Sequence, residues 1–533
     1  MTKVTSNLSK IVNKIIGQCR NIKPHQLTNT FAVKTKQDVN FVLKHLEKVP
    51  FDCRIFVRNK FNYLVEHHNG DTLKAKKFLE GLSNYCEQMT INMSVKEESL
   101  YLTTCELSNY CKKLIDTRHK KGVANDLTIK EMESVVISLG FLPVKGKSTK
   151  GKLNRYSDCK WWWRKIKPIY NRSIESVMRY IHVIWEKFQL YVSDRFLTLR
   201  RENKKRNEIF LNSLIALKDS GEEVELSEIS DSSLSYSINR VAELKARVAG
   251  LEQYADKFGY RTDLVTITAP SRFHCVNHKG RPNIKWNESS VRAVHKYFTG
   301  LWDCVISKFH RDNIKTSGFR VVEPHHDGTP HWHIILFSKE SDRDLTLDII
   351  RKYFLKDSPD EKGASQHRVI VKDLTQKKKR SFKGSYILKG IDLSPKNKSQ
   401  EDLGKSERMN AWGCVWGIRQ FYQFGGPAVN LWREARRIAK NSNIDDSSVW
   451  QSVRNGDWCE FIEICGGLNI PKGNRKIKLL KEYDNNLNSY GEEKGYVISG
   501  LEVDKKFHKL KQPLWKITSK LCALKIIGSE YYQ

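Results

Sequence analysis

Residues 320–337, RVVEPHHDGTPHWHIILF, decide the fold of the central part of this chain. The two ends of this stretch are rich in β-branched and aromatic residues, which is typical of strands. The Asp327-Gly328 pair between them is a strong signal for a tight hairpin turn, so we predict two antiparallel strands. Side chains at i and i+2 of a strand share one face, which places His331 beside His333. The opposite face would send three apolar side chains into the core: Trp332, Ile334 and Leu336.

This hairpin creates a candidate metal site. Two imidazoles on one strand can share a metal ion, and counting outward from the turn puts Glu323 opposite position 332, give or take one residue. A His331, His333 and Glu323 set with open positions suits Mg²⁺ or Mn²⁺ with a phosphate, and it does not exclude Zn²⁺. An HxH pair taken alone is more often two surface histidines. His325 and His326 in the turn are interpreted as loop or phosphate contacts.

The surrounding sequence extends the hairpin into a domain. Residues 264–270 and 367–374 have the composition of strands, and residues 289–310 and 345–355 have the apolar spacing of helices. Because the hairpin is antiparallel, we predict an α+β fold for residues 261–425, with a central antiparallel sheet flanked by helices.

Three further regions flank this domain. Residues 1–144 are predicted to be helical and carry no legible chemistry, and residues 426–533 are predicted to be mostly helical or irregular. Residues 145–260 form a basic, aromatic-rich region that is also predicted to be helical.

The charge of the chain points to a polyanionic partner. Lys and Arg total 93 against 60 Asp and Glu, a formal net charge of +33. Nucleic acid is the commonest partner for such an excess, and a generally basic surface is the alternative. No apolar run is long enough for a membrane span or a signal peptide, so we expect a cytoplasmic protein without membrane contact. The cysteines form no CxxC pair, which disfavours a zinc knuckle, and a disulfide framework is not expected.

Residues 161–165, WWWRK, open a strongly basic helical stretch. In one interpretation, Trp161, Trp162 and Trp163 stack on bases while Arg164 and Lys165 contact phosphates. In the other, which the sequence favours equally, the tryptophans belong to a core and the charges are solvated.

Residues 377–392, KKKRSFKGSYILKGID, carry a candidate nucleophile. On a helix, Phe382 and Tyr386 would share a face, with Lys389 one turn further on. A tyrosine hydroxyl beside a metal-polarised phosphate and an ammonium is a competent nucleophile, although Tyr386 alone would more often be a core ring. The preceding basic residues would hold the DNA backbone: Lys377, Lys378, Lys379 and Arg380.

The motif of residues 320–337 closely resembles the metal-site signature of the bacteriophage replication gene A proteins, which are rolling-circle initiators of the HUH endonuclease superfamily. The resemblance continues in TITAPSRFH upstream, and in YILKGID and WGIRQFYQFGGPAVNLWRE downstream. It covers roughly residues 155–470. It implies that His331 and His333 are the HUH histidines, that Glu323 is the third ligand, and that Tyr386 is the nucleophile.

The resemblance also sets expectations about mechanism. The family motif has two tyrosines where this chain has one, because Phe382 occupies the first position; a rival register places Gly390 on the second. It implies nicking of single-stranded or extruded origin DNA, a 5′-phosphotyrosyl intermediate and a free 3′-OH that primes a host polymerase. No GxxxxGK[ST] loop is present, so a host helicase is an expected partner, and a second copy of the chain could supply the missing nucleophile. The alternatives are a transposase or mobilisation relaxase of the same superfamily, and a non-enzymatic, metal-stabilised DNA-binding protein.

Overall fold

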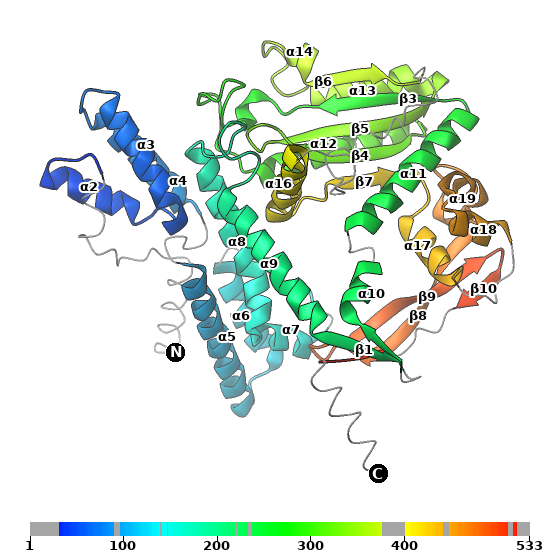
Figure 1. Ribbon diagram of the computed structural model, residues 1–533. Coiled ribbons are helices and arrows are strands. Elements are labelled where there is room, and N and C mark those ends of the chain that lie inside the picture. Colours follow the sequence, from blue (N-terminus) through cyan, green and yellow to red (C-terminus); the bar gives the residue numbers. More distant parts are fainter. Residues whose placement is uncertain are drawn as a thin grey trace. The chain divides into compact units, whose positions relative to one another are not determined.

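The structure is a computed structural model that describes residues 31–89, 96–138, 141–146, 148–218, 222–232, 237–375, 400–440, 447–509 and 515–519. The chain divides into two compact units. Unit 1 comprises Met1–Gln189 with Tyr483–Tyr496, and unit 2 comprises Leu190–Glu482 with Val497–Gln533. The four regions expected from the sequence stay a prediction. Figure 1 gives the element labels used below.

Unit 1 is helical around one hydrophobic core. The prediction of helices for the first part of the chain is confirmed here for the described residues. Its helices are α2 (Lys36–Leu46), η3 (Phe51–Cys53), α3 (Arg54–Glu66), α4 (Leu73–Glu87), α5 (Glu97–Lys120), α6 (Asn125–Ser138), α7 (Thr149–Tyr156) and α8 (Cys159–Tyr180).

The start of α8 differs from the DNA-contact interpretation. Trp162 is fully buried and Trp161 is 8% exposed, and both belong to the core of unit 1. The indole N–H of Trp162 donates to the backbone carbonyl of Tyr156 at 2.8 Å, which satisfies its one polar group inside the core. Trp161 and Trp162 are therefore packing residues, which corrects the expectation that they contact bases. Trp163 is partly buried against the same core.

A disulfide between Cys105 and Cys159 joins α5 to the first residue of α8. This pair was not expected from the sequence. Among the described free cysteines, most are buried, in agreement with a packing role: Cys53, Cys86, Cys111, Cys275 and Cys465.

Unit 2 is built on a five-stranded sheet with the strand order β6-β3-β5-β4-β7, in which every pairing is antiparallel. The strands are β3 (Tyr260–Ile267), β4 (Ser317–Pro324), β5 (Pro330–Lys339), β6 (Val369–Asp373) and β7 (Phe421–Phe424). The predicted hairpin is β4 and β5, which lie at the centre of the sheet beside β3 (Figure 1). The described residues are thus mixed helix and antiparallel sheet, as the α+β class predicted.

One face of this sheet packs on α12 (Val291–Arg311) and α13 (Arg343–Phe354) (Figure 1). Helix α12 begins at a Ser290 cap whose side chain accepts from the Ala293 N–H, and its apolar residues recur every three or four positions and are buried. Trp332 is fully buried there, with ring centroids 5.2 Å from Phe298 and 6.4 Å from Trp302. The predicted core face of β5 is confirmed, because Ile334 and Leu336 are also fully buried.

The other face packs on a second cluster. It is covered by α11 (Ser237–Lys257), α17 (Val429–Ile438), α18 (Ser448–Asn455) and α19 (Trp458–Ile464). Ile335 and Phe337 of β5 are fully buried in this cluster. Because His333 and His331 continue the same alternation, they lie on this face of the strand.

The remaining elements of unit 2 are α9 (Asp194–Asn212), β1 (Leu214–Lys218), β2 (Glu223–Glu225), α10 (Leu226–Ser232), η4 (Ser271–Phe273), η5 (Glu340–Asp342), α14 (Ala364–His367), α16 (Gln400–Trp416), η6 (Lys472–Asn474), β10 (Lys506–Lys509) and β11 (Trp515–Ser519), with parts of β8 (Ile477–Leu487) and β9 (Glu493–Val503). Four of these strands, β8 to β11, fall in the C-terminal region. The expectation that this region is mostly helical or irregular is therefore wrong for its second half. None of the helices within the described ranges is both long enough and apolar enough to cross a membrane.

Candidate functional site

The β4–β5 hairpin brings the predicted ligands together. Its register pairs Glu323 with His331, one position from the expected one and within the stated tolerance. The turn is closed by the His325 N–H, which donates to the Thr329 carbonyl at 2.7 Å, and by the Gly328 N–H, which donates to the His325 carbonyl at 2.8 Å. Gly328 has φ 78°, a conformation that a side chain would strain.

Two threonine hydroxyls, one in β3 and one directly after it, orient the histidine rings. Thr266 lies directly opposite His333, and its Oγ1 is hydrogen-bonded to His333 Nδ1 at 3.1 Å. Thr268 Oγ1 is hydrogen-bonded to His331 Nδ1 at 3.2 Å. Both contacts use Nδ1, so Nε2 of each ring is left to act as a ligand. Metal-binding histidines are usually held in this way by a partner on the other ring nitrogen.

The electrostatics of the three residues suit a cation. Burial lowers the pKa of His331 well below its usual value and also lowers the pKa of His333, which keeps both rings neutral and able to donate a lone pair. Burial raises the pKa of Glu323 to about 7. The Glu323 Oε2 atom lies 3.6 Å from His333 Nε2, and the two imidazole centroids are 4.7 Å apart. Two neutral nitrogens and a desolvated carboxylate fit a divalent metal ion.

A second group of potential ligands adjoins the first. The candidate ligand atoms of His274, His325 and Asp327 all lie within 4.8 Å of one another. The His325 ring centroid is 5.5 Å from that of His331, so the two groups form one histidine-rich cluster. Burial lowers the pKa of His325 to about 4, which also keeps this ring neutral.

The contacts of Asp327 favour a structural role. Its carboxylate is fully buried and accepts hydrogen bonds from the Cys275 N–H at 3.0 Å, the Thr329 N–H at 3.0 Å and the Thr329 hydroxyl at 2.9 Å. His274 Nδ1 lies 3.3 Å from Oδ1. These donors occupy both carboxylate oxygens and tie the hairpin turn to the segment after β3. The His331, His333 and Glu323 group is therefore the better candidate for a metal ion.

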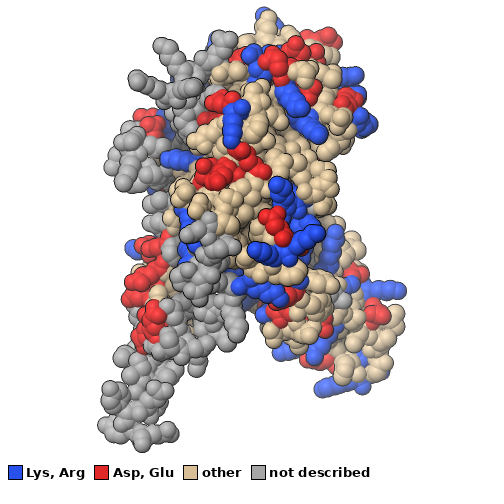
Figure 2. Space-filling model, turned by 90° about the vertical axis from the view of Figure 1, so that its right-hand side faces the viewer, with Lys and Arg blue, Asp and Glu red and all other residues tan. Residues whose placement is uncertain are grey.

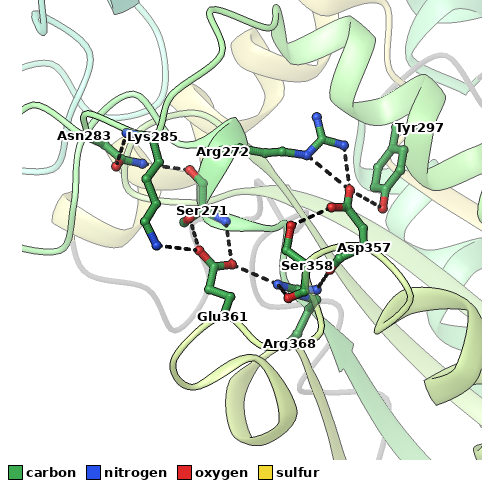
Figure 3. Close-up of polar contacts among 9 residues, drawn as sticks. All are labelled: Ser271, Arg272, Asn283, Lys285, Tyr297, Asp357, Ser358, Glu361 and Arg368. Atoms are coloured by element: carbon green, nitrogen blue, oxygen red, sulfur yellow. Dashed lines mark hydrogen bonds and ion pairs between the residues drawn. The ribbon is translucent and has the colours of Figure 1, made fainter.

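A polar network supports the segment that carries His274 (Figure 3). The Arg272 guanidinium donates to the Asp357 carboxylate at 2.6 Å, and the Ser271 N–H donates to the Glu361 carboxylate at 3.3 Å. Both acids lie in the connection after α13, so this connection fixes η4 and the residue that follows it. The other side chains drawn in the network are Asn283, Lys285, Tyr297, Ser358 and Arg368.

The predicted nucleophile lies outside the described residues. The same holds for Lys389 and for the basic run of Lys377, Lys378, Lys379 and Arg380, and for Phe382. The described elements on either side of this segment each contact part of the histidine site. Before it, β6 pairs with β3, whose Thr266 contacts His333. After it, the Trp412 indole N–H of α16 donates to the Gly328 carbonyl in the hairpin turn at 2.9 Å.

The predicted DNA contacts in unit 1 divide into two groups. Trp161 and Trp162 are in the core, whereas Arg164 and Lys165 are exposed on the same helix. Arg164 donates to the Tyr490 hydroxyl and lies 3.5 Å from Asp158, so its charge is partly balanced within unit 1.

Sequence reasoning missed four residues of this cluster: Thr266, Thr268, His274 and Asp327. Thr266 and Thr268 alternate along a predicted strand, as the two histidines do, and this shared period of two is a usable signal. The role of Asp327 had no such signal, because the Asp-Gly pair already had a full explanation as a turn.

Residues 142–394 match the family model described as bacteriophage replication gene A protein (GPA). The chain is 31% identical over 350 residues to the replication gene A protein of Escherichia phage 186, which is 62% of this chain and 50% of that protein. It is also 31% identical over 367 residues to the probable replication protein P12 of Pseudoalteromonas phage PM2, covering 66% of this chain and 56% of that protein.

A third relative carries a more specific name. The probable replication endonuclease from prophage-like region 1 of Salmonella typhi is 28% identical over 385 residues, 67% of this chain and 48% of that protein. The chain thus spans about half the length of the curated relatives it matches. No solved structure matches it.

Proposed function

We propose that this chain, whose residues 142–394 match the bacteriophage replication gene A protein family, is a site-specific endonuclease that nicks one DNA strand to start rolling-circle replication of a phage or prophage genome. The observation that carries the proposal is the hairpin of unit 2. It presents two neutral imidazoles and a half-buried carboxylate on one face of a sheet. The domain would then be an HUH nuclease domain.

His331, His333 and Glu323 would hold one divalent ion, Mg²⁺ or Mn²⁺. When bound, such an ion polarises the phosphate to be cut and stabilises the charge that develops on it. The protein's own contribution is orientation. Thr266 and Thr268 fix the two rings through Nδ1, and the register of β4 against β5 sets Glu323 opposite His331.

Tyr386 would be the nucleophile. Its phenolic oxygen loses a proton and forms a bond to phosphorus, while the bond from phosphorus to the 3′ oxygen breaks and that oxygen takes up a proton. The products are a 5′-phosphotyrosyl protein and a free 3′-OH. The reverse transfer rejoins the strand without ATP, because the energy of the broken ester is kept in the new one. Lys389 would stabilise charge on the phosphate or position the tyrosine.

The border of the tyrosine segment supports this assignment. The segment runs from the end of β6 to the start of α16, and contacts of β3 and of α16 lead from these two elements to the histidine hairpin. The segment is therefore flanked on both sides by elements that contact the structure around the histidines. Lys377, Lys378, Lys379 and Arg380 would hold the DNA backbone close to the cut, and the exposed Arg164 and Lys165 would add contacts from unit 1.

The protein would work with partners in the bacterial cytoplasm. The free 3′-OH requires a polymerase, and a host helicase would separate the strands. Phe382 has no hydroxyl, so the second cleavage after one round of replication needs another nucleophile. We propose that a second copy of the chain supplies it. The test is whether the second cleavage by isolated adduct depends on the concentration of added free protein.

A covalent adduct tests the main proposal. The protein is incubated with Mg²⁺ or Mn²⁺ and single-stranded fragments that tile the replicon carrying its gene, and is then run on a denaturing gel. We expect a protein–DNA adduct that maps to Tyr386 and is absent from Tyr386→Phe. An adduct at another tyrosine would overturn the site, and absence of any adduct across the tiled fragments would favour the non-enzymatic alternative. Cutting only at ends of mobile elements or at a transfer origin would favour a transposase or relaxase.

Two substitutions separate the candidate metal groups. His331→Ala should abolish nicking while DNA affinity changes only a few-fold, because affinity comes from many phosphate contacts. Asp327→Asn should leave metal affinity largely intact and instead loosen the turn. The opposite pattern, with metal affinity lost only in Asp327→Asn, would move the metal to His274, His325 and Asp327.

A further inference from the structure

The positive charge of this protein is unevenly distributed. Figure 2 shows one face on which Lys and Arg atoms occur in patches, with Asp and Glu atoms among them. A binding surface must therefore be located from local geometry. In unit 2, a cavity of about 430 Å³ is lined by five arginines, and its described lining residues include no acid. The arginines are Arg200, Arg240, Arg247, Arg419 and Arg433.

The walls of this cavity are held by polar contacts between separate elements. Arg433 of α17 makes a bidentate contact with Glu243 of α11, with distances of 3.0 and 2.9 Å. Arg247 of α11 donates to the Gln423 side chain of β7 at 2.7 Å. The Gln420 amide donates to the Met409 carbonyl of α16 at 3.1 Å. The cavity is thus formed by elements that are fixed to one another.

The charges in this cavity are not balanced by the described protein residues around it. Arg247 is 4% exposed, and its Nε has no hydrogen-bond partner among the described residues. Its nearest described carboxylate is Glu243, at 3.4 Å, and that carboxylate already binds Arg433. One buried acid therefore serves two guanidiniums. A buried cation with an unused donor is costly unless an anion completes it.

One wall of the cavity lies on the same face of the sheet as the histidines. Phe421, which lines it, pairs with Val321 of β4. Directly paired residues share a face, and so do Val321 and Glu323, two positions apart on one strand. The backbone of Phe421 is one interstrand spacing from β4, and Glu323 lies two residues further along that strand. The two backbones are therefore about 8 Å apart. A strand of DNA at the histidines could therefore continue into the cavity.

We infer that this arginine cavity is a binding site for the backbone phosphates of single-stranded DNA, next to the bond that is cut. Guanidinium groups bind phosphate oxygens with two parallel hydrogen bonds, which suits a site with several arginines and no acid in its described lining. Phe421 adds a ring on which a base can stack. The inference rests on the proposed function, because its ligand is the strand that the endonuclease would cut.

Cys414 provides a direct test, because it is exposed and lines the cavity. Cys304 is a matched control, since it is also exposed but lies on α12, the helix that packs on the opposite face of the sheet. The protein is treated with a thiol reagent, with and without an oligodeoxythymidylate, and modification of each cysteine is measured by mass spectrometry. We expect the DNA to slow modification of Cys414 several-fold and to leave Cys304 unchanged. Equal protection of both, or of neither, would overturn the inference.

A pair of substitutions gives an independent readout. Arg240 and Arg419 are exposed side chains in the cavity, so their replacement by alanine should leave the fold intact. Arg240→Ala with Arg419→Ala should lower the salt dependence of oligodeoxythymidylate binding by about 1.4 in the slope of log K against log salt, at about 0.7 per phosphate contact. The control pair, Arg292→Ala with Arg311→Ala, removes the same charge from exposed positions of α12 and should change the slope much less.

The outcomes distinguish this inference from the proposed nuclease activity. Protection of Cys414 with no covalent adduct would support the cavity and refute the endonuclease. A normal adduct with an unchanged salt slope and no protection would refute the cavity and leave the endonuclease standing. If sodium phosphate or dTMP protects Cys414 as well as the oligonucleotide does at equal phosphate concentration, the cavity is a small-anion site and the inference is wrong.

Discussion

Replacing Thr266 by valine removes the hydroxyl that contacts His333, and replacing Thr268 by valine removes the hydroxyl that contacts His331. Both substitutions keep the shape of the side chain. Each hydroxyl is hydrogen-bonded to an imidazole Nδ1, at 3.1 Å for Thr266 and 3.2 Å for Thr268. Loss of such an orienting partner typically weakens metal binding by about 10- to 100-fold. For these neutral contacts we expect the lower figure, about tenfold or about 1.4 kcal/mol for each substitution.

The assay is a titration of the protein with Mn²⁺, in which the free ion is measured by electron paramagnetic resonance. Thr262→Val is the matched control, since Thr262 lies four residues before Thr266 on β3 and its buried hydroxyl has no hydrogen-bond partner among the described residues. We expect normal Mn²⁺ affinity for that control and weaker affinity for Thr266→Val and Thr268→Val. Unchanged affinity in both would refute the role of these hydroxyls, and an equal loss in the control would assign the effect to the strand.

Three further predictions concern stability. The ion pair between Arg155 and Glu492, at 2.6 Å, lowers the pKa of the Glu492 carboxyl to about 2. This ion pair therefore stabilises the fold above about pH 4.5, and its contribution is lost as the pH falls towards 2. Glu492→Gln should flatten the fall in melting temperature between about pH 4.5 and about pH 2, measured by calorimetry. Trp162→Ala should lower the unfolding free energy of unit 1 by about 3–5 kcal/mol in a urea titration followed by circular dichroism. Asp263 is fully buried and bound by Arg343 at 2.9 and 2.7 Å, so Asp263→Ala should cost about 3–5 kcal/mol in unit 2, and hydrogen exchange of β3 amides would report it.

The central hairpin was predictable because two local signals agree there. The Asp-Gly pair specifies the turn, and the alternation of HWHIILF specifies which side chains face the core. A slip of one residue would move Trp332 to a half-buried histidine position and the histidines into the core, so the hydrophobic pattern also fixes the register. The observed pairing of Glu323 with His331 follows from these two constraints.

Of the C-terminal strands, β8 was missed because it carries no such pattern. Most of β8 is exposed, and its sequence IKLLKEYDNNL places polar residues on both faces. A strand of this kind is stabilised mainly by backbone hydrogen bonds to its partners, and β9 pairs with both β8 and β10 in a separate sheet. Hydrophobic periodicity identifies a strand by its buried face, so it gives no signal for a strand of which most residues are exposed on both faces.

The tryptophans at 161–163 show the opposite difficulty. The sequence allowed both a core and a DNA-binding interpretation, because aromatic rings between basic residues serve either role. In the structure, the buried face of α8 is wide enough to include both Trp161 and Trp162, while Arg164 and Lys165 stay exposed. The core interpretation is therefore the correct one for these two tryptophans. That width depends on how many helices surround α8, and this number is a property of the tertiary fold.

Of the two candidate metal groups, only the one formed by a single hairpin could be predicted from the sequence. His331, His333 and Glu323 come from one hairpin, so local geometry brings them together. His274 is 53 positions from Asp327 and reaches it only through the segment after β3 and the network that fixes η4. The donors on Asp327 are backbone N–H groups as well as side chains, and N–H donors compete with a metal ion for the same oxygens. The local group keeps its Nε2 atoms and a carboxylate for a ligand, whereas the long-range group uses its carboxylate to hold the turn on which the local group depends.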